Sequence, residues 1–437
     1  MPFLPLTGPL ASIMSMSISV VIPTLNRKKL VLRMLDALSA EPDIAEVIVV
    51  DDGSTDETAE AVRRRETPWP LRVIMQPNRG PAAARNAGWQ AAQSELILFL
   101  DDDMLPMPGL LAAHKSAHEG TASAIVIGAI RLSADSPRTL AALCFEHEFS
   151  AHANAWTPGS DTGWLDVPIV FSNTSLPRRL LEESGGFDES FRMREDLELG
   201  YRLLQAGARP LAAPAAIAYQ QYTKTAQDLL RNAEVFAEGD VLFARKHPEN
   251  RVQGQLNWLK TQRRSGLEFA VAMRWLAEPL LAGACALGAS NSAARRLGVR
   301  ALVARRRLRW YRAVLTRQGE LSRVKTLVGL KLLHTLIWAF FVLSILAVPV
   351  LGALGKLKLA TCLAAGVLGE CIILALNHWR CPVSSVADRL TSDRAPNYDI
   401  YLPEWLARWN KEIFGTLFVL GLLLLAEKWW KTILLSY

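Results

Sequence analysis

Short apolar runs alternate with amphipathic segments over the N-terminal part of the chain. Continuous apolar runs predict buried strands, and apolar residues that recur at helical spacing predict helices between them. The expected strands are 18–22, 47–50, 71–75 and 96–100, and the expected helices are 28–38, 56–65 and 81–93, the second capped by Ser54 or Thr55. Strands that alternate with helices in this order predict an α/β domain with a mostly parallel sheet.

The pattern becomes less regular after the fourth expected strand. Residues 131–164 have little periodicity and many small or polar residues, which predicts a long, partly mobile insertion of the kind that shapes acceptor sites. Residues 167–207 predict a second ordered part that ends in a helix over 194–206. Residues 210–320 are predicted to be helical, basic and amphipathic, which is typical of a segment at a membrane surface.

Long apolar segments dominate the last quarter of the chain. Segments 332–354 and 357–376 are long enough to span a bilayer. Segment 413–426 is shorter, but we expect it to span as well because a tryptophan pair and a lysine follow it as interfacial anchors. A fourth apolar segment, 267–289, contains three charged residues, which favours an interfacial or re-entrant helix over a span.

The net charge of +7 is concentrated in one stretch before the first expected span. This stretch contains Arg295, Arg296, Arg300, Arg305, Arg306, Arg307, Arg309 and Arg312. Because of its location we expect it to contact the lipid bilayer and not nucleic acid. It also predicts a multi-pass protein of the cell inner (cytoplasmic) membrane whose N-terminal domain faces the cytoplasm. The five cysteines are scattered, without the spacing of a zinc site or a disulfide framework.

These patterns divide the chain into four expected parts. They are a leader over 1–17, an α/β domain over 18–250, a basic amphipathic linker over 251–331, and a transmembrane domain with about three helices over 332–437. His334 and His378 lie at span boundaries, where we expect interfacial anchors; the alternative is a pair that binds haem or a metal.

Polar residues follow three of the expected strands at the point where each strand ends. Residues 23–26 follow the first strand, 51–54 the second, and Asp101, Asp102 and Asp103 the fourth. Carboxyl ends of parallel strands meet at one edge of a sheet, where ligands bind. Carboxylates one residue apart can hold a divalent cation that neutralises a diphosphate, so we expect a metal here; the alternative is a polar turn.

Five short motifs occur in a fixed order over this region. They are Val-Val-Ile-Pro-Thr-Leu-Asn at 20–26, Val-Val-Asp-Asp-Gly-Ser-Thr-Asp at 49–56, Asn-Arg-Gly at 78–80, Ala-Arg-Asn-Ala-Gly at 84–88 and Phe-Leu-Asp-Asp-Asp at 99–103. Together they resemble the signature of family 2 glycosyltransferases, over about 18–218. The resemblance implies the GT-A fold, a UDP-, GDP- or dTDP-sugar donor, and Mg²⁺ or Mn²⁺ as cofactor.

The resemblance implies roles for residues on the donor side. Pro23 and Asn26 would line the nucleotide pocket, and Asp52 would contact the base or the ribose, whereas Asp51 would serve the structure. Arg85 would approach the donor from its helix.

Asn86 either approaches the donor together with Arg85 or braces that helix. Of the three adjacent aspartates, Asp103 would be the direct metal ligand, and Asp101 would contact the ribose or the metal.

A second group of motifs resembles the acceptor half of the same family. Within 172–175, 185–189 and 195–196, Gly185, Gly186 and Glu195 would line the acceptor site, and Asp196 matches the general base that takes the acceptor proton. The alternative for Asp196 is a surface salt bridge to Arg202. Because Asp196 lies near a helix start, whose dipole favours an ionised carboxylate, we expect the base.

Two departures from the family pattern limit the expected activity. Many members have a metal-binding histidine where this chain has Ala-Tyr-Gln-Gln at 218–221, so water or substrate oxygens would complete the metal shell. Residues 262–266 lack the Arg-Trp pair of processive synthases, which favours transfer of a single sugar. The resemblance thus predicts an inverting transferase that acts on a hydroxyl of a membrane-associated acceptor, such as a lipid-linked saccharide or an envelope polysaccharide precursor.

Two alternatives stay open at the level of sequence. One is a polyprenyl-phosphate glycosyltransferase, whose acceptor is a phosphate and needs no deprotonation; the acceptor motifs argue against it. The other is a catalytically silent membrane scaffold that binds nucleotide sugars, which the absent histidine favours.

Overall fold

The computed structural model describes residues 16–155, 170–248, 265–391, 393 and 395–434. The chain forms two units, each with its own internal contacts. The N-terminal unit comprises Met1–Arg264 and Trp275–Arg317, and the C-terminal unit comprises Ser265–Arg274 and Gln318–Tyr437. Residues 251–331, expected as one linker, are therefore divided between the two units among their described residues.

One mixed sheet of eight strands forms the centre of the N-terminal unit. Its strands are β1 (Ile18–Thr24), β2 (Glu46–Asp51), β3 (Leu71–Met75), β4 (Leu96–Leu100), β5 (Met104–Pro106), β6 (Ala124–Leu132), β7 (Asn173–Pro177) and β8 (Arg209–Gln220). Their order is β3-β2-β1-β4-β7-β6-β8-β5. The first four strands in this order run parallel, β7 is antiparallel to both β4 and β6, and β8 is parallel to β6 but antiparallel to β5.

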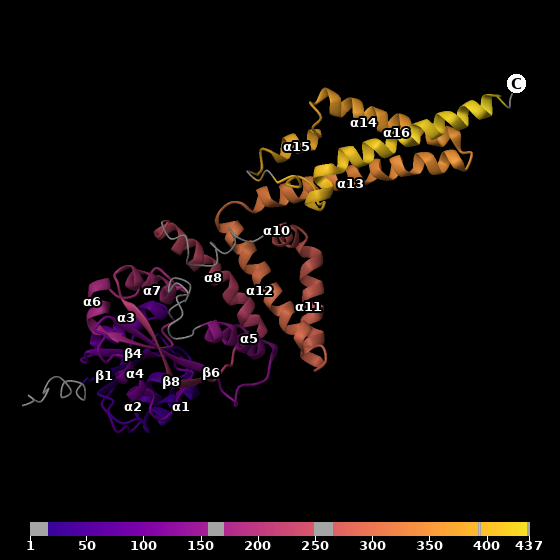
Figure 1. The fold of residues 1–437 in the computed structure, drawn as a ribbon. Coiled ribbons are helices and arrows are strands. Elements are labelled where there is room, and N and C mark those ends of the chain that lie inside the picture. The colour runs from indigo at the N-terminus through magenta and orange to yellow at the C-terminus, as the bar shows by residue number, and fades with distance from the viewer. Residues whose placement is uncertain (1–15, 156–169, 249–264, 392, 394, 435–437) are drawn as a thin grey trace, which may run out of the picture. The chain divides into compact units, whose positions relative to one another are not determined.

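Helices cover both faces of the sheet because the central strands carry apolar side chains on both faces. The helices are α1 (Lys28–Leu38), α2 (Thr58–Arg63), α3 (Pro81–Ala91), α4 (Leu110–Ala117), α6 (Arg178–Ser184) and α7 (Glu195–Gln205). Val20 and Ile22 of β1 face a core with α1, α2 and α4, whereas Val21 faces a core with α3, α6 and α7. Figure 1 shows these two layers on opposite sides of the strands. Such double burial is typical of parallel strands.

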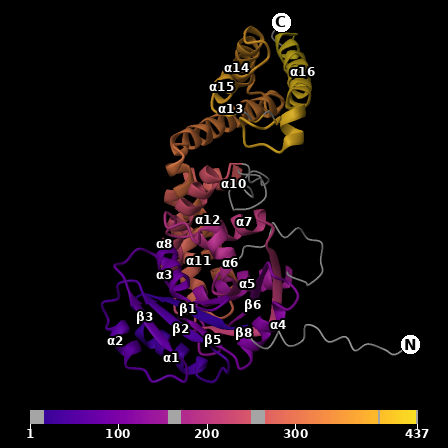
Figure 2. The ribbon, with the colours of Figure 1, turned by 90° about the vertical axis from the view of Figure 1, so that its left-hand side faces the viewer.

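Four further helices of this unit pack beside β6 and β8. They are α5 (Leu140–Ala155), α8 (Ala226–Lys246), α11 (Arg274–Ser290) and α12 (Arg295–Arg317). Leu140, Leu230, Cys285 and Leu302, one from each helix, belong to a single buried cluster. Figures 1 and 2 both show α12 beside α8. The arginine-rich segment is thus a helix with one face buried inside the N-terminal unit.

Several element predictions are confirmed and three are wrong. Residues 210–320, expected to be helical, begin with the strand β8, which pairs with β6 and β5. The helix over 28–38 and the strands over 71–75 and 96–100 have the predicted bounds. The expected insertion over 131–164 is wrong over its described part, because α5 occupies Leu140–Ala155 and buries its apolar residues against α8 and α12. The expected caps of the second helix are also wrong, since α2 begins at Thr58 after Glu57.

The C-terminal unit is helical in its described residues. Its elements are α10 (Ser265–Ala272), α13 (Leu321–Ala353), α14 (Leu357–Leu376), α15 (Pro382–Ala387) and α16 (Glu404–Leu434). The helices α13, α14 and α16 are long and apolar enough to cross a membrane, as predicted, although α13 begins before 332 and α16 extends beyond 413–426 at both ends. Segment 267–289 forms no single helix but is divided between α10 and α11.

His334 on α13 contacts a carboxylate. Its Nδ1 lies 3.2 Å from the Asp399 Oδ2, and the Ser384 hydroxyl donates to the same oxygen. The described residues contain no group of three or more His, Cys, Asp or Glu side chains that could hold a metal ion. The structure thus shows Asp399 as a partner of His334.

Candidate active site

The loops that follow β1 and β2 are joined by hydrogen bonds of Asn26. Its backbone N–H donates to the Ser54 Oγ at 2.8 Å, and its Oδ1 accepts from the backbone N–H and the hydroxyl of Thr55 at 2.7 and 3.2 Å. Asn26 has a φ of 53°, in the left-handed region that asparagine tolerates better than most residues. Pro23 lies opposite Val50 in the sheet, just before this loop. Both predicted donor residues therefore lie where β1 and β2 end.

Two aspartates at the end of β2 hold the neighbouring turns. Asp51 Oδ1 accepts from two backbone N–H groups of the following turn at 3.1 and 2.6 Å. Asp52 is 4% exposed, and its two oxygens accept from the backbone N–H groups of Arg79 and Gly80 at 2.9 and 2.8 Å. Asp51 thus has the structural role that the sequence indicated, and Asp52 orders the turn that leads into α3.

The three aspartates after β4 form an acidic cluster with a basic partner that the sequence reasoning missed. Arg27 Nη1 donates to Asp102 at 2.7 Å and lies 3.3 Å from Asp103 Oδ2. Thr24 donates its hydroxyl to the other oxygen of Asp102 at 2.8 Å. Burial lowers the pKa of Arg27, but the charges of Asp102 and Asp103 outweigh it and raise the pKa above its ordinary value. Asp102 is therefore held inside the protein, beside Asp101 and Asp103.

Asp101 and Asp103 fit a divalent cation. Burial raises the pKa of Asp103 to about 6, and the neighbouring charge of Asp101 adds to the rise, so a cation would relieve the repulsion. Gln220 lies 3.3 Å from both oxygens of Asp103, close to where the family places its histidine. Carboxylate oxygens are ligands that Mg²⁺ and Mn²⁺ prefer. Because the described residues form no group of three such side chains, water and diphosphate oxygens would complete the shell.

Arg85 connects the acidic cluster to the start of α7. Its Nη2 donates to Asp101 Oδ1 at 2.9 Å and its Nη1 donates to Glu195 Oε1 at 2.7 Å. The second oxygen of Asp101 accepts from the Ser172 hydroxyl at 2.6 Å. Arg85 is only 6% exposed, so these ion pairs are shielded from water. One guanidinium group therefore joins two acidic segments that lie far apart in the sequence.

Asn86 braces the segment between α6 and α7. Its Nδ2 donates to the carbonyl oxygen of Phe187 at 2.8 Å, and its Oδ1 accepts from the N–H of the same residue at 2.9 Å. Gly186 has a φ of 72°, and a Cβ there would lie 2.7 Å from Asn86 Oδ1. Gly185 ends α6 with a φ of 76°. Both glycines, expected at the acceptor site, thus also allow a tight turn against α3.

Asp196 lies in the first turn of α7, beside Glu195. Its Oδ1 accepts from the N–H of Leu197 at 2.7 Å. Burial raises the pKa of Asp196, and the charges of Arg194 and Arg85 only partly offset this rise. Burial likewise raises the pKa of Glu195 to about 7, with a contribution from the charge of Asp196. The expected effect of the helix dipole on Asp196 is therefore outweighed by burial.

The alternative role of Asp196, a salt bridge to Arg202, is not observed. Arg202 pairs with Glu198 at 2.8 Å and donates to the carbonyl oxygens of Ser184 and Gly186 at 2.6 and 2.7 Å. Arg202 therefore holds the turn before α7 and leaves Asp196 to other partners.

A buried polar group on α8 fixes the residue just before α7. Arg194 has a φ of 75°, its Nε lies 2.9 Å from Asp240 Oδ1, and its guanidinium lies 4.5 Å from the centre of the Phe236 ring. Trp310 of α12 donates its Nε1–H to Asp240 Oδ2 at 2.7 Å. A Cβ on Gly239 would lie 2.3 Å from the Met193 carbonyl oxygen, so the loop packs directly on α8. The position of Asp196 thus depends on two helices that come later in the chain.

These supporting residues were missed for identifiable reasons. Arg27 directly follows Asn26, so the sequence already placed a basic residue beside the polar loop, and this could have indicated a partner for the aspartates. Asp240 and Trp310 lie outside the region of the family resemblance and carry no local motif. Only the packing of α8 and α12 brings them to Arg194.

The fold and this cluster define a class of protein: an α/β domain whose strand ends hold acidic residues, next to a carboxylate at a helix start. Residues 19–147 match the family model described as glycosyl transferase family 2. The chain therefore carries a family 2 glycosyltransferase domain.

Curated relatives agree with this assignment. The chain is 30% identical over 279 residues to validoxylamine A glucosyltransferase of Streptomyces hygroscopicus subsp. limoneus, covering 56% of this chain and 60% of the relative. It is 27% identical over 238 residues to pre-mycofactocin glycosyltransferase of Mycobacterium tuberculosis, covering 53% of this chain and 48% of the relative. A mannosyltransferase of Pyrobaculum calidifontis solved with GDP-Man and Mn²⁺ has 24% identity and a TM-score of 0.44, covering 66% of this chain and 85% of that chain. The chain thus spans less than two thirds of the length of these curated relatives.

Proposed function

We propose that the protein is an inverting, metal-dependent glycosyltransferase that moves one sugar from a nucleoside-diphosphate sugar to a hydroxyl of a membrane-associated acceptor. The observation that carries this proposal is the link through Arg85, which joins Asp101 of the acidic cluster to Glu195, the neighbour of Asp196. The matched family domain and relatives named as glycosyltransferases support the same activity.

Each side of the candidate site has a distinct task in this proposal. Asp103 and Asp101 would hold Mg²⁺ or Mn²⁺, which supplies charge neutralisation for the leaving diphosphate. Pro23, Asn26 and Asp52 would form the edge of the nucleotide pocket. Asp196 would take the proton of the acceptor hydroxyl while the anomeric carbon is attacked from the face opposite the diphosphate. A carboxylate with a raised pKa is a stronger base than an ordinary one, which suits this task.

The location follows from the C-terminal helices and the basic residues before them. Among the residues that the structure describes, three helices are long and apolar enough to span a membrane, and the arginine-rich α12 precedes α13 in the sequence. Basic residues next to spans stay in the cytoplasm, so we place the N-terminal unit at the cytoplasmic face of the inner membrane. A bilayer-bound enzyme favours an acceptor that is itself lipid-linked.

The test is donor hydrolysis by the full chain purified in detergent. The protein is incubated with a panel of UDP-, GDP- and dTDP-sugars and Mn²⁺, and release of the nucleoside diphosphate is measured. We expect release from one donor, abolished by a chelator and reduced about 100-fold or more in Asp103→Asn. The matched control is Asp135→Asn, which changes an exposed carboxylate away from the acidic cluster. Binding of a donor without release, even with membrane lipid extract, would replace the enzyme by a silent nucleotide-sugar scaffold.

A further inference from the structure

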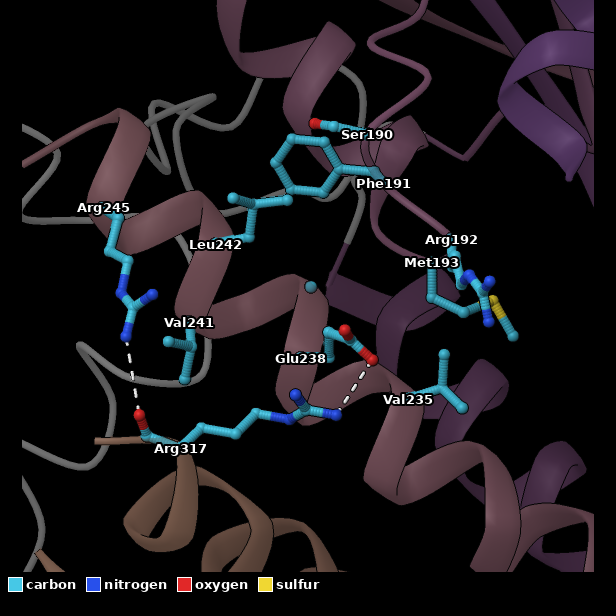
Figure 3. A pocket seen from close by; sticks show the side chains of 11 residues that line it. Ser190, Phe191, Arg192, Met193, Val235, Glu238, Val241, Leu242, Arg245 and Arg317 are labelled. Atoms are coloured by element: carbon cyan, nitrogen blue, oxygen red, sulfur yellow. Dashed lines mark hydrogen bonds and ion pairs between the residues drawn. The ribbon is translucent and has the colours of Figure 1, made fainter. Parts of the chain in front are cut away.

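A cavity of about 400 Å³ lies in the N-terminal unit beside the loop that leads to Asp196. Its walls come from residues 190–193, one face of α8 and Arg317 at the end of α12 (Figure 3). Met193 belongs to this wall and is followed by Arg194, Glu195 and Asp196, so the wall continues directly into α7. A volume of this size is typical of small-molecule sites. No residue of the donor side lines the cavity among the described residues.

Guanidinium groups outnumber carboxylates in this cavity. Arg192, Arg245 and Arg317 line it, and Glu238 is its one acidic lining residue in the described part of the chain. Glu238 pairs with Arg317 Nη2 at 2.9 Å. Arg245 donates to the backbone carbonyl oxygen of Arg317 at 3.5 Å, at the long limit of a hydrogen bond. The cavity therefore concentrates positive charge that an anion would neutralise.

The remaining lining is apolar. Met193, Val235 and Leu242 contribute side chains to the same cavity, and Figure 3 shows Arg245 and Arg317 on one side of it and Arg192 with Met193 on the other. Guanidinium groups match phosphate oxygens in geometry and bind them with charge-assisted hydrogen bonds. A free inorganic anion would leave the apolar part unused, whereas a phosphorylated amphiphile matches both parts of the lining.

We propose that this cavity binds the phosphate or diphosphate group of an amphiphilic acceptor and thereby holds the acceptor next to Asp196. The proposal rests on the proposed function, which it extends by naming the chemical class of the acceptor. Arg245 and Arg317 contact the phosphate oxygens, and residues 190–193, which line the cavity, lead directly into the helix that carries Asp196. The same chemistry occurs in the headgroups of bulk phospholipids, which the test distinguishes.

The test measures binding of farnesyl diphosphate to the full chain in detergent by titration calorimetry. We expect farnesyl diphosphate to bind and farnesol, which lacks the phosphates, to bind at least about tenfold more weakly. Replacing both cations in Arg245→Gln, Arg317→Gln should raise the Kd for farnesyl diphosphate about tenfold or more. The matched control is Arg231→Gln, another exposed arginine of α8, which pairs with Asp228 and does not line the cavity. Both substituted side chains are exposed, so the fold should persist, as a thermal scan checks.

Several results would overturn the proposal. An unchanged Kd in the double variant would exclude the two arginines as the phosphate site. Displacement of farnesyl diphosphate by an equal concentration of phosphatidylglycerol in mixed micelles would assign the cavity to bulk lipid headgroups. Donor hydrolysis without acceptor keeps the two proposals apart: the double variant should hydrolyse donor at the wild-type rate. If even the wild-type protein fails to hydrolyse any donor, the proposed function fails, whereas the binding result still decides what the cavity holds.

Discussion

The expected donor side and acceptor side of the candidate site are ordered in different ways. On the donor side, Asp51 and Asp52 accept hydrogen bonds from backbone N–H groups of turns that follow β2 and β3. On the acceptor side, the residues around Asp196 are held by side chains from distant helices. Arg85 of α3 contacts Glu195, and Asp240 of α8 contacts Arg194. The donor side is thus built by backbone turns at the strand ends, and the acceptor side by side chains from distant helices.

This difference matters because the two kinds of support fail differently. Loss of a carboxylate that accepts from a turn leaves backbone N–H groups unsatisfied and mainly lowers stability near the expected nucleotide site. Loss of one member of a buried ion pair leaves the other charge uncompensated, which changes both the position and the pKa of its neighbours. The donor side should therefore respond in binding, and the acceptor side in the chemical step.

The largest effect is expected for Asp196→Asn. An amide cannot accept the acceptor proton, so we expect kcat for transfer to fall about 1,000-fold, within the range for loss of a general base. The Kd for the donor should change little, because the donor side is untouched. Steady-state kinetics with the acceptor and calorimetry with the donor measure the two quantities. The control is Glu183→Gln, an exposed change on α6. Equal weakening of donor binding and transfer would contradict the separation of the two sides.

A smaller effect, on stability and donor binding instead of on kcat, is expected for Asp52→Ala. This change removes the acceptor for the Arg79 and Gly80 N–H groups, and the lost buried hydrogen bonds should cost about 1–3 kcal/mol of unfolding free energy. We expect weaker donor binding with kcat at saturating donor nearly unchanged. Glu57→Gln, on the exposed part of the adjoining loop, is the control. A lower kcat with unaltered donor affinity would show that Asp52 acts on the acceptor side instead.

Sequence reasoning predicted the strand ends around the expected donor side better than the contacts that hold the residues around Asp196. The strand ends and the turn residues 51–54 form short patterns in neighbouring residues, so the sequence was enough to predict them. Helix α5 was not predicted because its amphipathic signal is weak and only packing against α8 and α12 makes it a helix with a buried face. Asp240 and Trp310 are separated from Arg194 by long stretches of chain, and no local motif predicts a contact of this kind.

A moderate effect is expected for Trp310→Phe. The substitution keeps an aromatic ring but removes the N–H that donates to Asp240 at 2.7 Å, so Arg194 loses part of its support. We expect kcat to fall about tenfold with little change in donor Kd, the size expected for a slightly misplaced catalytic group. Trp275→Phe, an exposed change on α11, serves as control. Because Trp310 acts only through position, the pH at which activity is half-maximal should shift little in Trp310→Phe.

The smallest effect concerns stability as a function of pH. Burial raises the pKa of Glu195 from 4.5 to about 7, so the folded protein retains a proton there that the unfolded chain releases. A raised carboxyl pKa makes the free energy of unfolding fall as pH rises from about 4.5 to about 7, with no further change above that range. Glu195→Gln removes this titration, so the difference in Tm between pH 5 and pH 7.5 should shrink by a few degrees relative to Glu183→Gln. A pH dependence of Tm that is the same in both variants would mean that Arg85 keeps Glu195 ionised throughout, and Glu195 would then add no pH dependence to the stability of the protein.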